Sequence, residues 1–414
     1  MEQYIAALNI VKELEKNGFS AYIVGGYVRD TLLNIKSNDI DITTNALPDD
    51  LNHLFKTIDS TANKYLSCKV MYEGYEFEIT TFRTDIEYIN HRHPVTKIVE
   101  NLEEDLKRRD FTINALALDS RGKIIDLCDG LLDIKNKLVR VIGDPFKRFD
   151  EDVLRIFRGC YLVSKLNFDI EDSTFKGMQA SAKYVTYLSD ERIFDELTKI
   201  LKFAHYKKAL SYLIKTSVLN YLKINKVIEY VINSNVRPSI DDIIAISIYI
   251  NTGYEFKVAN NKKRLYFDAA FLAKEGFTNL NLYKYDLDTI ILADKIRAFV
   301  DNRNTNFDEL VKTKLALPIS SKKDLKVNIL KKLRLLLFFY SDYYVIMARD
   351  GGKMTYSRVK KYQELRDGLK EEVGISKEKY VEPVQNDDDD DDFLSFMKKD
   401  KEEKEVNLED TLTE

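Results

Sequence analysis

The chain has 414 residues, 44% hydrophobic and 32% charged, which is enough apolar material for two to four domains with real cores. It has no 18-residue apolar run and opens directly into a charged amphipathic pattern, so we expect neither a membrane span nor a signal peptide. Three widely spaced cysteines and four histidines favour a reduced, cytoplasmic protein and exclude disulfide frameworks and His-rich metal clusters.

Acidic residues gather at the C-terminal end. Residues 382–414 hold 14 acidic and 4 basic side chains, a net charge of −10, whereas the whole chain carries −4, so the remainder carries +6. A mildly basic body suits a nucleic-acid partner. The tail has too few apolar residues to fold alone, so we expect a disordered, solvated segment. Its stretch Asp387 to Met397 could instead dock a protein partner, and the sequence leaves both readings open.

The first 140 residues predict short helices alternating with strands. Residues 2–17 predict a helix closed by Gly18, residues 19–26 a strand entering a turn, and residues 27–33 a short helix. The stretches DIDITT (39–44) and YEFEITTF (75–82) alternate polar and apolar residues, which predicts strands of a half-buried sheet. The polar residues 83–105 show no period and predict a long functional loop.

From about residue 144 to residue 348, apolar residues recur at helical spacing with few strand indications. The fold class is therefore predicted to be α+β, with a small mixed or antiparallel sheet and its helices first and an all-α remainder after it.

Asp39 and Asp41 would share one face of the first alternating strand, with Ile40 and Ile42 packed inward. Two carboxylates this close repel each other, and a divalent cation removes the conflict. Mg²⁺ prefers carboxylate and phosphate oxygens. Glu78 on the second alternating strand could add a ligand, and Glu76 on the same face is its rival.

Gly25 and Gly26 stand just ahead of the short predicted helix, where backbone amides favour an anion. Arg29, one turn later, can add a bidentate contact to phosphate. Taken singly, the glycines fit an ordinary turn and the acids a solvated edge strand. Together, their spacing predicts a triphosphate and metal site.

The stretch GGYVRDTLLNIKSNDIDITT (25–44) resembles the signature of class II nucleotidyltransferases of the polymerase-beta superfamily, the tRNA CCA-adding enzymes and bacterial poly(A) polymerases. Five further stretches match in order: EITTFRTD, YINHRHP, DLKRRDFTINALAL, RFDEDVLRIFR and ERIFDEL. The resemblance implies a catalytic nucleotidyltransferase head (1–143), a helical neck with the nucleotide-selecting motif (144–205), a helical body (206–310), a tRNA-binding tail (311–381) and the acidic segment (382–414).

The stretch RRDFTINAL combines two arginines with an acid and an amide. Its guanidiniums suit phosphate, and Asp110 and Asn114 offer hydrogen bonds to a ribose. The alternative is a helix cap whose polar side chains satisfy the backbone. The resemblance implies that Arg109 contacts the incoming nucleotide.

EDVLR places Asp152 and Arg155 three residues apart, on one face of an expected helix, where a surface ion pair is the commoner meaning. Cytosine and adenine both present an exocyclic amine beside a ring-nitrogen acceptor, which a carboxylate and a guanidinium complement. Guanine and uracil reverse that pattern. The resemblance implies that this pair selects C and A, that Glu151 orients Arg155, and that Arg158 continues the face.

Two positions depart from the family pattern. Tyr161 stands where relatives usually carry another arginine, and Asn90 replaces an acid in the loop that relatives use to switch from C to A.

The implied function is Mg²⁺-dependent addition of C, C and A to the tRNA 3′ end from CTP and ATP, without a nucleic-acid template. One rival is a poly(A) polymerase or A-adding enzyme of the same family. The other is a non-catalytic RNA-binding scaffold, which the retained Asp39, Asp41 and Glu78 disfavour. The sequence does not indicate an oligomeric state.

Overall fold

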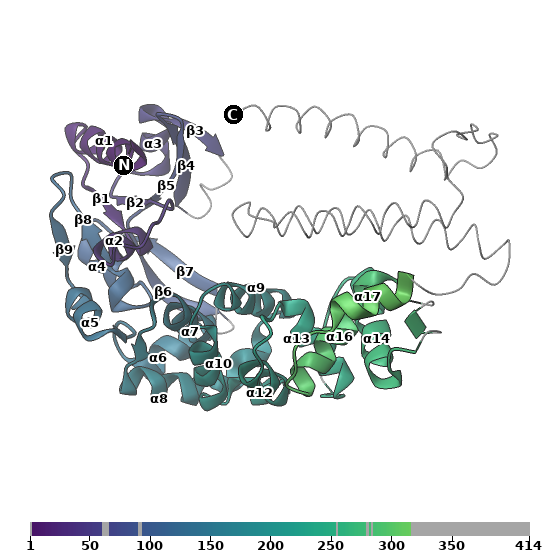
Figure 1. Ribbon diagram of the computed structural model, residues 1–414. Helices are drawn as coiled ribbons and strands as arrows, with labels where there is room; N and C mark the ends of the chain where they lie inside the picture. Colours follow the sequence, from purple (N-terminus) through teal and green to yellow (C-terminus); the bar gives the residue numbers. More distant parts are fainter. Residues whose placement is uncertain are drawn as a thin grey trace, which may run out of the picture. The chain divides into compact units, whose positions relative to one another are not determined.

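The computed structural model describes residues 2–59, 66–89, 93–253, 256–278, 281–282 and 285–315 (Figure 1). The chain divides into two compact units, Met1–Leu317 and Pro318–Glu414, and all described residues belong to the first. Nearly all of the expected tail, the whole acidic segment and Asn90 therefore lie outside the described residues. Among the residues described, no helix is long and apolar enough to cross a membrane.

A seven-stranded mixed sheet forms the first part of the structure, in the order β3-β4-β5-β2-β1-β8-β9. β2 and β5 run parallel, with Asp41 in register with Glu78, and the other neighbours are antiparallel. The strands are β1 (Ala21–Val24), β2 (Asp41–Thr44), β3 (Lys56–Asp59), β4 (Ser67–Tyr72), β5 (Tyr75–Thr81), β8 (Leu116–Leu118) and β9 (Ile124–Asp126).

Helices cover both faces of this sheet. Apolar side chains of α1 (Glu2–Lys16) pack against β1, β2, β4 and β5 in one core, and Leu106 of α4 (Leu102–Lys107) packs with Val24 and Ala117 on the other side. The remaining helices of this part are α2 (Gly26–Leu32), α3 (Pro48–Leu54), η2 (Thr112–Asn114) and α5 (Gly130–Asn136). The predicted helices at residues 2–17 and 27–33 and the predicted strands are confirmed.

The prediction of a long loop over residues 83–105 is wrong. β6 (Arg83–Ile89) and β7 (His93–Ile98) pair antiparallel as a separate two-stranded ribbon, and α4 follows. The ribbon exposes apolar Ile86 and Ile98 and keeps polar residues in its strands, so it shows no half-buried alternation. Cross-strand backbone hydrogen bonds hold it instead.

The prediction of a helical remainder is confirmed for the described residues. One apolar core runs from Phe111 to Leu310. Its helices are α6 (Pro145–Glu151), α7 (Leu154–Leu166), α8 (Asp172–Ser181), η3 (Ala182–Tyr187), α9 (Asp190–Leu201), α10 (Tyr206–Lys215), α11 (Val218–Tyr221), α12 (Asn225–Asn233), α13 (Ile240–Tyr249), α14 (Asn260–Glu275), α16 (Leu287–Val300) and α17 (Phe307–Leu315), and a short parallel pair joins β10 (Leu138–Val139) to β11 (Asp169–Ile170).

α7 has an apolar face and a polar face. One buries Phe157, Cys160 and Val163 in the helical core, where Gly159 permits close packing: a Cβ there would lie 2.5 Å from Met178 Cε. The other face carries Arg155, Arg158 and Lys165, spaced by three and seven residues and so on the same side of the helix. This polar face turns toward the sheet-containing part of the chain.

Candidate active site

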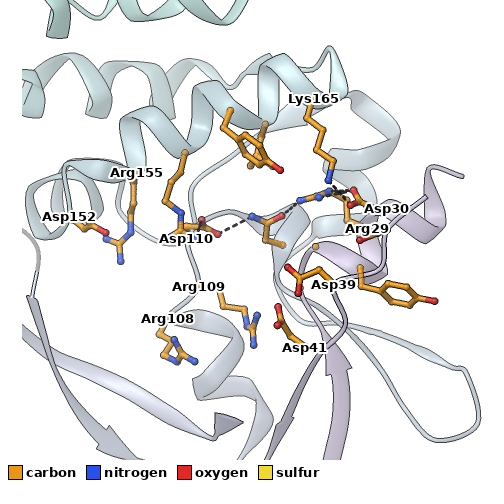
Figure 2. A pocket seen from close by; sticks show the side chains of 18 of the residues that line it. Arg29, Asp30, Asp39, Asp41, Arg108, Arg109, Asp110, Asp152, Arg155 and Lys165 are labelled. Atoms are coloured by element: carbon orange, nitrogen blue, oxygen red, sulfur yellow. Dashed lines mark hydrogen bonds and ion pairs between the residues drawn. The ribbon is translucent and has the colours of Figure 1, made fainter. Parts of the chain in front are cut away.

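A cavity of about 930 Å³ lies between the polar face of α7 and the sheet-containing part (Figure 2). Eleven of the thirteen predicted site residues line it: Gly25, Gly26, Arg29, Asp39, Asp41, Arg109, Asp110, Asn114, Asp152, Arg155 and Arg158. The other two, Glu78 and Glu151, do not line it. Segments far apart in the sequence therefore meet at one cavity.

The acid pair lies where β2 begins. Asp41 is the first residue of that strand, and Asp39 precedes the strand instead of lying within it. Burial, the Asp39 charge and, more weakly, the Glu78 charge raise the pKa of Asp41 to about 6, against an opposing effect of Arg109. Asp41 therefore sits in an excess of negative charge that a cation would relieve.

Glu78 lies on the strand next to Asp41 but does not line the cavity. It lies opposite Asp41 in register, is exposed, and its carboxylate accepts a 2.7 Å hydrogen bond from the Ser67 hydroxyl. Its rival Glu76 forms a 2.8 Å ion pair with Lys69. Within the described ranges, no three acidic, histidine or cysteine side chains gather closely enough to hold a metal ion. A cation here would be held by Asp39 and Asp41 and completed by other oxygens.

The glycine turn brings backbone close to these groups. Gly25 has φ 82°, a left-handed conformation that favours glycine, and a Cβ there would lie 3.4 Å from Arg109 Nη1 and 3.5 Å from Asp41 Oδ2. Arg109 also pairs with the fully buried Asp105 at 3.3 Å, while its buried Nε has no hydrogen-bond partner. That orphaned donor at the cavity wall fits an anionic ligand.

Arg29 is buried and already engaged. Its Nε and Nη2 both donate to Asp30 Oδ1, at 2.9 and 2.6 Å, and Nη1 donates to Asn114 Oδ1. Two of its five N–H groups remain for a ligand.

Asp110 and Asn114 form hydrogen bonds with each other and with their neighbours. Asn114 Nδ2 donates to Asp110 Oδ1 at 3.1 Å, the Phe111 amide donates to the same oxygen, and Arg158 pairs with Asp110 Oδ2 at 2.7 Å. Burial alone would raise the pKa of Asp110, but the Arg158 charge and these hydrogen bonds lower it. Both the structural and the ligand-binding interpretation of these residues agree with this geometry.

The expected helix through EDVLR is broken. α6 ends at Glu151, Asp152 has extended backbone (φ −144°, ψ 98°), and α7 begins at Leu154. Asp152 Oδ1 accepts from the Leu154 amide at 3.0 Å. Burial raises the pKa of Asp152 against the opposing charges of Arg155 and Arg158. No salt bridge joins Asp152 to Arg155 in the described structure, so the simple surface ion pair is wrong.

Arg155 is held by other groups. It is 4% exposed, its Nη1 lies 3.4 Å from Glu151 Oε2, and its Nη2 donates to the Tyr88 hydroxyl at 2.7 Å. Its guanidinium also lies over the Tyr88 ring, 5.3 Å from the centroid. Tyr88 in turn donates to Asp85 of the same strand. The expected Glu151 contact is thus present, and the β6–β7 ribbon adds a second one.

Sequence reasoning missed several cavity residues, chiefly Tyr88, Asp85, Asp30 and Lys165. Lys165 could have been found from its position ten residues after Arg155 on the same helical face. The partners of Tyr88 and Asp30 come from distant segments and leave no local pattern. Tyr161 also lines the cavity and packs edge-on against Phe203, with ring centroids 5.6 Å apart.

Comparisons with known proteins show what the chain is similar to. Residues 21–140 match the family model described as "Poly A polymerase head domain", and residues 167–225 match "Probable RNA and SrmB- binding site of polymerase A". A CCA-adding enzyme of Staphylococcus haemolyticus is 33% identical over 350 residues, covering 79% of this chain and 87% of the relative. One from Streptococcus uberis is 34% identical over 346 residues, covering 79% and 86%.

Solved structures give the same result. The Bacillus stearothermophilus CCA-adding enzyme in complex with CTP matches with a TM-score of 0.64 at 28% identity, covering 90% of this chain and 93% of that chain. The Thermotoga maritima CCA-adding enzyme complexed with tRNA-CCA matches with a TM-score of 0.56 at 19% identity, covering 87% and 94%, and this likeness shows the fold alone.

Proposed function

The chain belongs to the family of CCA-adding enzymes, and we propose that it adds C, C and A to the 3′ end of tRNA from CTP and ATP without a nucleic-acid template. The expected α+β fold with a nucleotidyltransferase head and a helical remainder agrees with this membership. Since tRNA is the substrate and all three cysteines are free, we propose a cytoplasmic location.

One observation carries the proposal. A single cavity brings together an acid pair, a set of arginines, and a carboxylate and a guanidinium on the opposite wall (Figure 2). The acid pair Asp39 and Asp41 lies at the head, whereas Asp152 and Arg155 lie at the start of α7. A nucleoside triphosphate placed between them would have its phosphates at one wall and its base at the other.

We propose Mg²⁺ as the cation at Asp39 and Asp41. The donor set fits, because two carboxylates and substrate phosphates are typical Mg²⁺ ligands and the cation would relieve the repulsion at Asp41. When bound, it would activate the attacking hydroxyl and stabilise the pyrophosphate leaving group. Glu78, through the sheet register, would support this wall without entering it.

The residues of the chain bind and orient the reactants. Gly25 and Gly26 allow the triphosphate to approach the backbone, and Arg29 and Arg109 hold its charge. The tRNA 3′ hydroxyl then attacks the α-phosphate of CTP or ATP, a new phosphodiester bond forms, and pyrophosphate leaves. Asn114 Nδ2 keeps one N–H beyond its bond to Asp110, which suits a ribose hydroxyl.

Base selection rests on Asp152 and Arg155. The carboxylate would accept from the exocyclic amine of C or A, and the guanidinium would donate to the adjacent ring nitrogen. Glu151 and Tyr88 fix Arg155, while Arg158 links this wall to Asp110. Guanine and uracil would leave buried groups unpaired, at about 1–3 kcal/mol each.

We propose that the head spans residues 1–143, the neck 144–205 and the body 206–310. The first family model ends at residue 140, just before α6 begins the helical part, and the second bridges neck and body at residues 167–225. Its description supports RNA contact there.

Single-nucleotide extension tests the proposal. The substrates are tRNA lacking CCA, tRNA ending in CC and complete tRNA, each with Mg²⁺ and CTP, ATP or both. We expect two Cs, then one A, then arrest. Asp41→Asn should abolish transfer, and Glu76→Gln, an exposed acid on neighbouring β5, should retain it. A ladder of As without CTP would instead show a poly(A) polymerase, and a single A on CC-ended tRNA an A-adding enzyme. Binding without any transfer would show a scaffold.

A further inference from the structure

A series of ion pairs and hydrogen bonds links α7 to the head. Lys165 Nζ lies 2.7 Å from Asp30 Oδ2, and the Asp30 side chain is 1% exposed. The other oxygen of Asp30 accepts from Nε and Nη2 of Arg29. Figure 2 shows Lys165, Asp30 and Arg29 meeting at the cavity wall. Each carboxylate oxygen of Asp30 therefore serves a different cation.

The same series of polar contacts leads back to α7. Arg29 Nη1 donates to Asn114, Asn114 donates to Asp110, and Asp110 pairs with Arg158 at 2.7 Å. Arg158 and Lys165 are seven residues apart, about two turns, so they lie on one face of α7. The neck helix thus contacts both ends of a polar network whose middle belongs to the head.

The charges of this network do not cancel. It holds the cations Arg29, Arg158 and Lys165 and the carboxylates Asp30 and Asp110, a net of +1. Without Lys165 the net would be zero, because Asp30 alone would neutralise Arg29. The net charge acts strongly on a ligand here, because the Arg29–Asp30 pair is almost fully buried and water screens its charges only weakly.

Lys165 carries the positive charge in the last turn of α7. Its side chain is 15% exposed and lines the cavity. Tyr161, one turn earlier, lines the same cavity without a charge and packs against Phe203.

We propose that Lys165 is a positioning residue of the triphosphate site. It compensates the Asp30 carboxylate, so that Arg29 is held in place by Asp30 without losing its net attraction for phosphate. The inference rests on the proposed function for the identity of the ligand. Because both substrates share the triphosphate, Lys165 acts equally on CTP and ATP, in contrast to Asp152 and Arg155.

Equilibrium binding of Mg-CTP and Mg-ATP to the full chain tests this role without requiring transfer. Lys165→Met should weaken both nucleotides by at least about tenfold, with their ratio unchanged, as expected for loss of a partner to a buried charge. Adding Asp30→Asn to that variant removes the uncompensated carboxylate and restores the net charge of +1. The double variant should therefore recover to within about threefold of the unmodified chain, a recovery that a merely structural role for Lys165 would not produce.

Two further variants complete the test. Lys165→Arg should bind within about threefold of the unmodified chain. Lys208→Met removes an equally short 2.7 Å ion pair with the exposed Asp169 and should change neither affinity. If Lys165→Met does not fold, the double variant still tests the charge argument.

The outcomes separate this inference from the proposed function. Unchanged affinity in Lys165→Met, or a double variant as weak as the single one, would overturn the role of Lys165 while CCA addition stood. Nucleotide binding with the expected pattern but no transfer would overturn the function alone. A chain that binds neither nucleotide would overturn both.

Discussion

Replacing Asp41 with asparagine should stabilise the metal-free protein while abolishing nucleotide transfer. The side chain of Asp41 is half-buried beside Asp39, and its pKa is raised from 3.8 to about 6. The ionised form is therefore destabilised in the folded state relative to the unfolded chain. Asparagine has nearly the same shape and carries no charge, so it removes this penalty at neutral pH.

The pH dependence of this stabilisation follows from the linkage between proton binding and folding. A carboxyl whose folded pKa lies above its unfolded value contributes stability that is complete below pH 3.8 and is lost as pH rises through about 6. A rise of about two units in the pKa of Asp41 corresponds to about 3 kcal/mol in the free energy of unfolding, which partial exposure of the side chain reduces to about 2 kcal/mol. The advantage of Asp41→Asn should thus be absent near pH 4, grow between pH 4 and 6, and be constant above.

Urea unfolding in EDTA at pH 4.5, 6 and 8, followed by circular dichroism, measures this difference; the chain has no tryptophan for fluorescence. Glu76→Gln is the control, because Glu76 is exposed and paired with Lys69, and it should change stability by less than about 0.5 kcal/mol. Mg²⁺ should stabilise the unmodified chain but not Asp41→Asn, and so reduce the difference in their free energies of unfolding at pH 8. A gap that is independent of pH, or that favours aspartate at pH 8 in EDTA, would refute the reasoning.

Three further substitutions probe residues that line the cavity, and a fourth, at Gly18, is a control. Asp152→Ala removes the proposed acceptor for the base amine, so kcat/KM for CTP and ATP should fall by about 10- to 100-fold and discrimination against UTP and GTP should relax in competition assays. Tyr88→Phe removes the hydroxyl that holds Arg155, and misincorporation should rise with little change in Tm, whereas unchanged fidelity would contradict the contact. Gly25→Ala and Gly18→Ala both place alanine at positive φ and should each cost about 1 kcal/mol. Only Gly25→Ala should lose nucleotide binding in an affinity titration, because nothing lies within 4 Å of a Cβ at Gly18.

Two strands of the head were predictable from alternation in the sequence. The stretch that contains β2 (DIDITT, 39–44) and the one that contains β5 (YEFEITTF, 75–82) alternate polar and apolar residues, and β5 buries every second side chain from Phe77 to Thr81. This period reveals both strands and the face that carries Asp41 and Glu78. The β6–β7 ribbon follows the same strand geometry without that burial. Exposed Ile86 and polar cross-strand neighbours leave no period in its sequence, so only the backbone pairing reveals it.

The polar contacts of the cavity were less predictable than its residues. Lys165 and Asp30 are 135 positions apart, and Arg155 and Tyr88 are 67 apart. Such pairs form when α7 packs beside the head, and local patterns contain no trace of that packing. The sequence therefore places the cations on one face of α7 and leaves their partners undetermined.

The break between α6 and α7 has a consequence for base selection. In a continuous helix, Asp152 and Arg155 would be neighbours at i and i+3, where opposite charges pair with each other. Extended backbone at Asp152 instead turns its carboxylate to the Leu154 amide, and Glu151 and Tyr88 hold Arg155. Neither group satisfies the other, although both line the cavity. Each group thus keeps hydrogen-bonding capacity that the other does not use, as the proposed selection of cytosine and adenine by their amine and ring nitrogen requires.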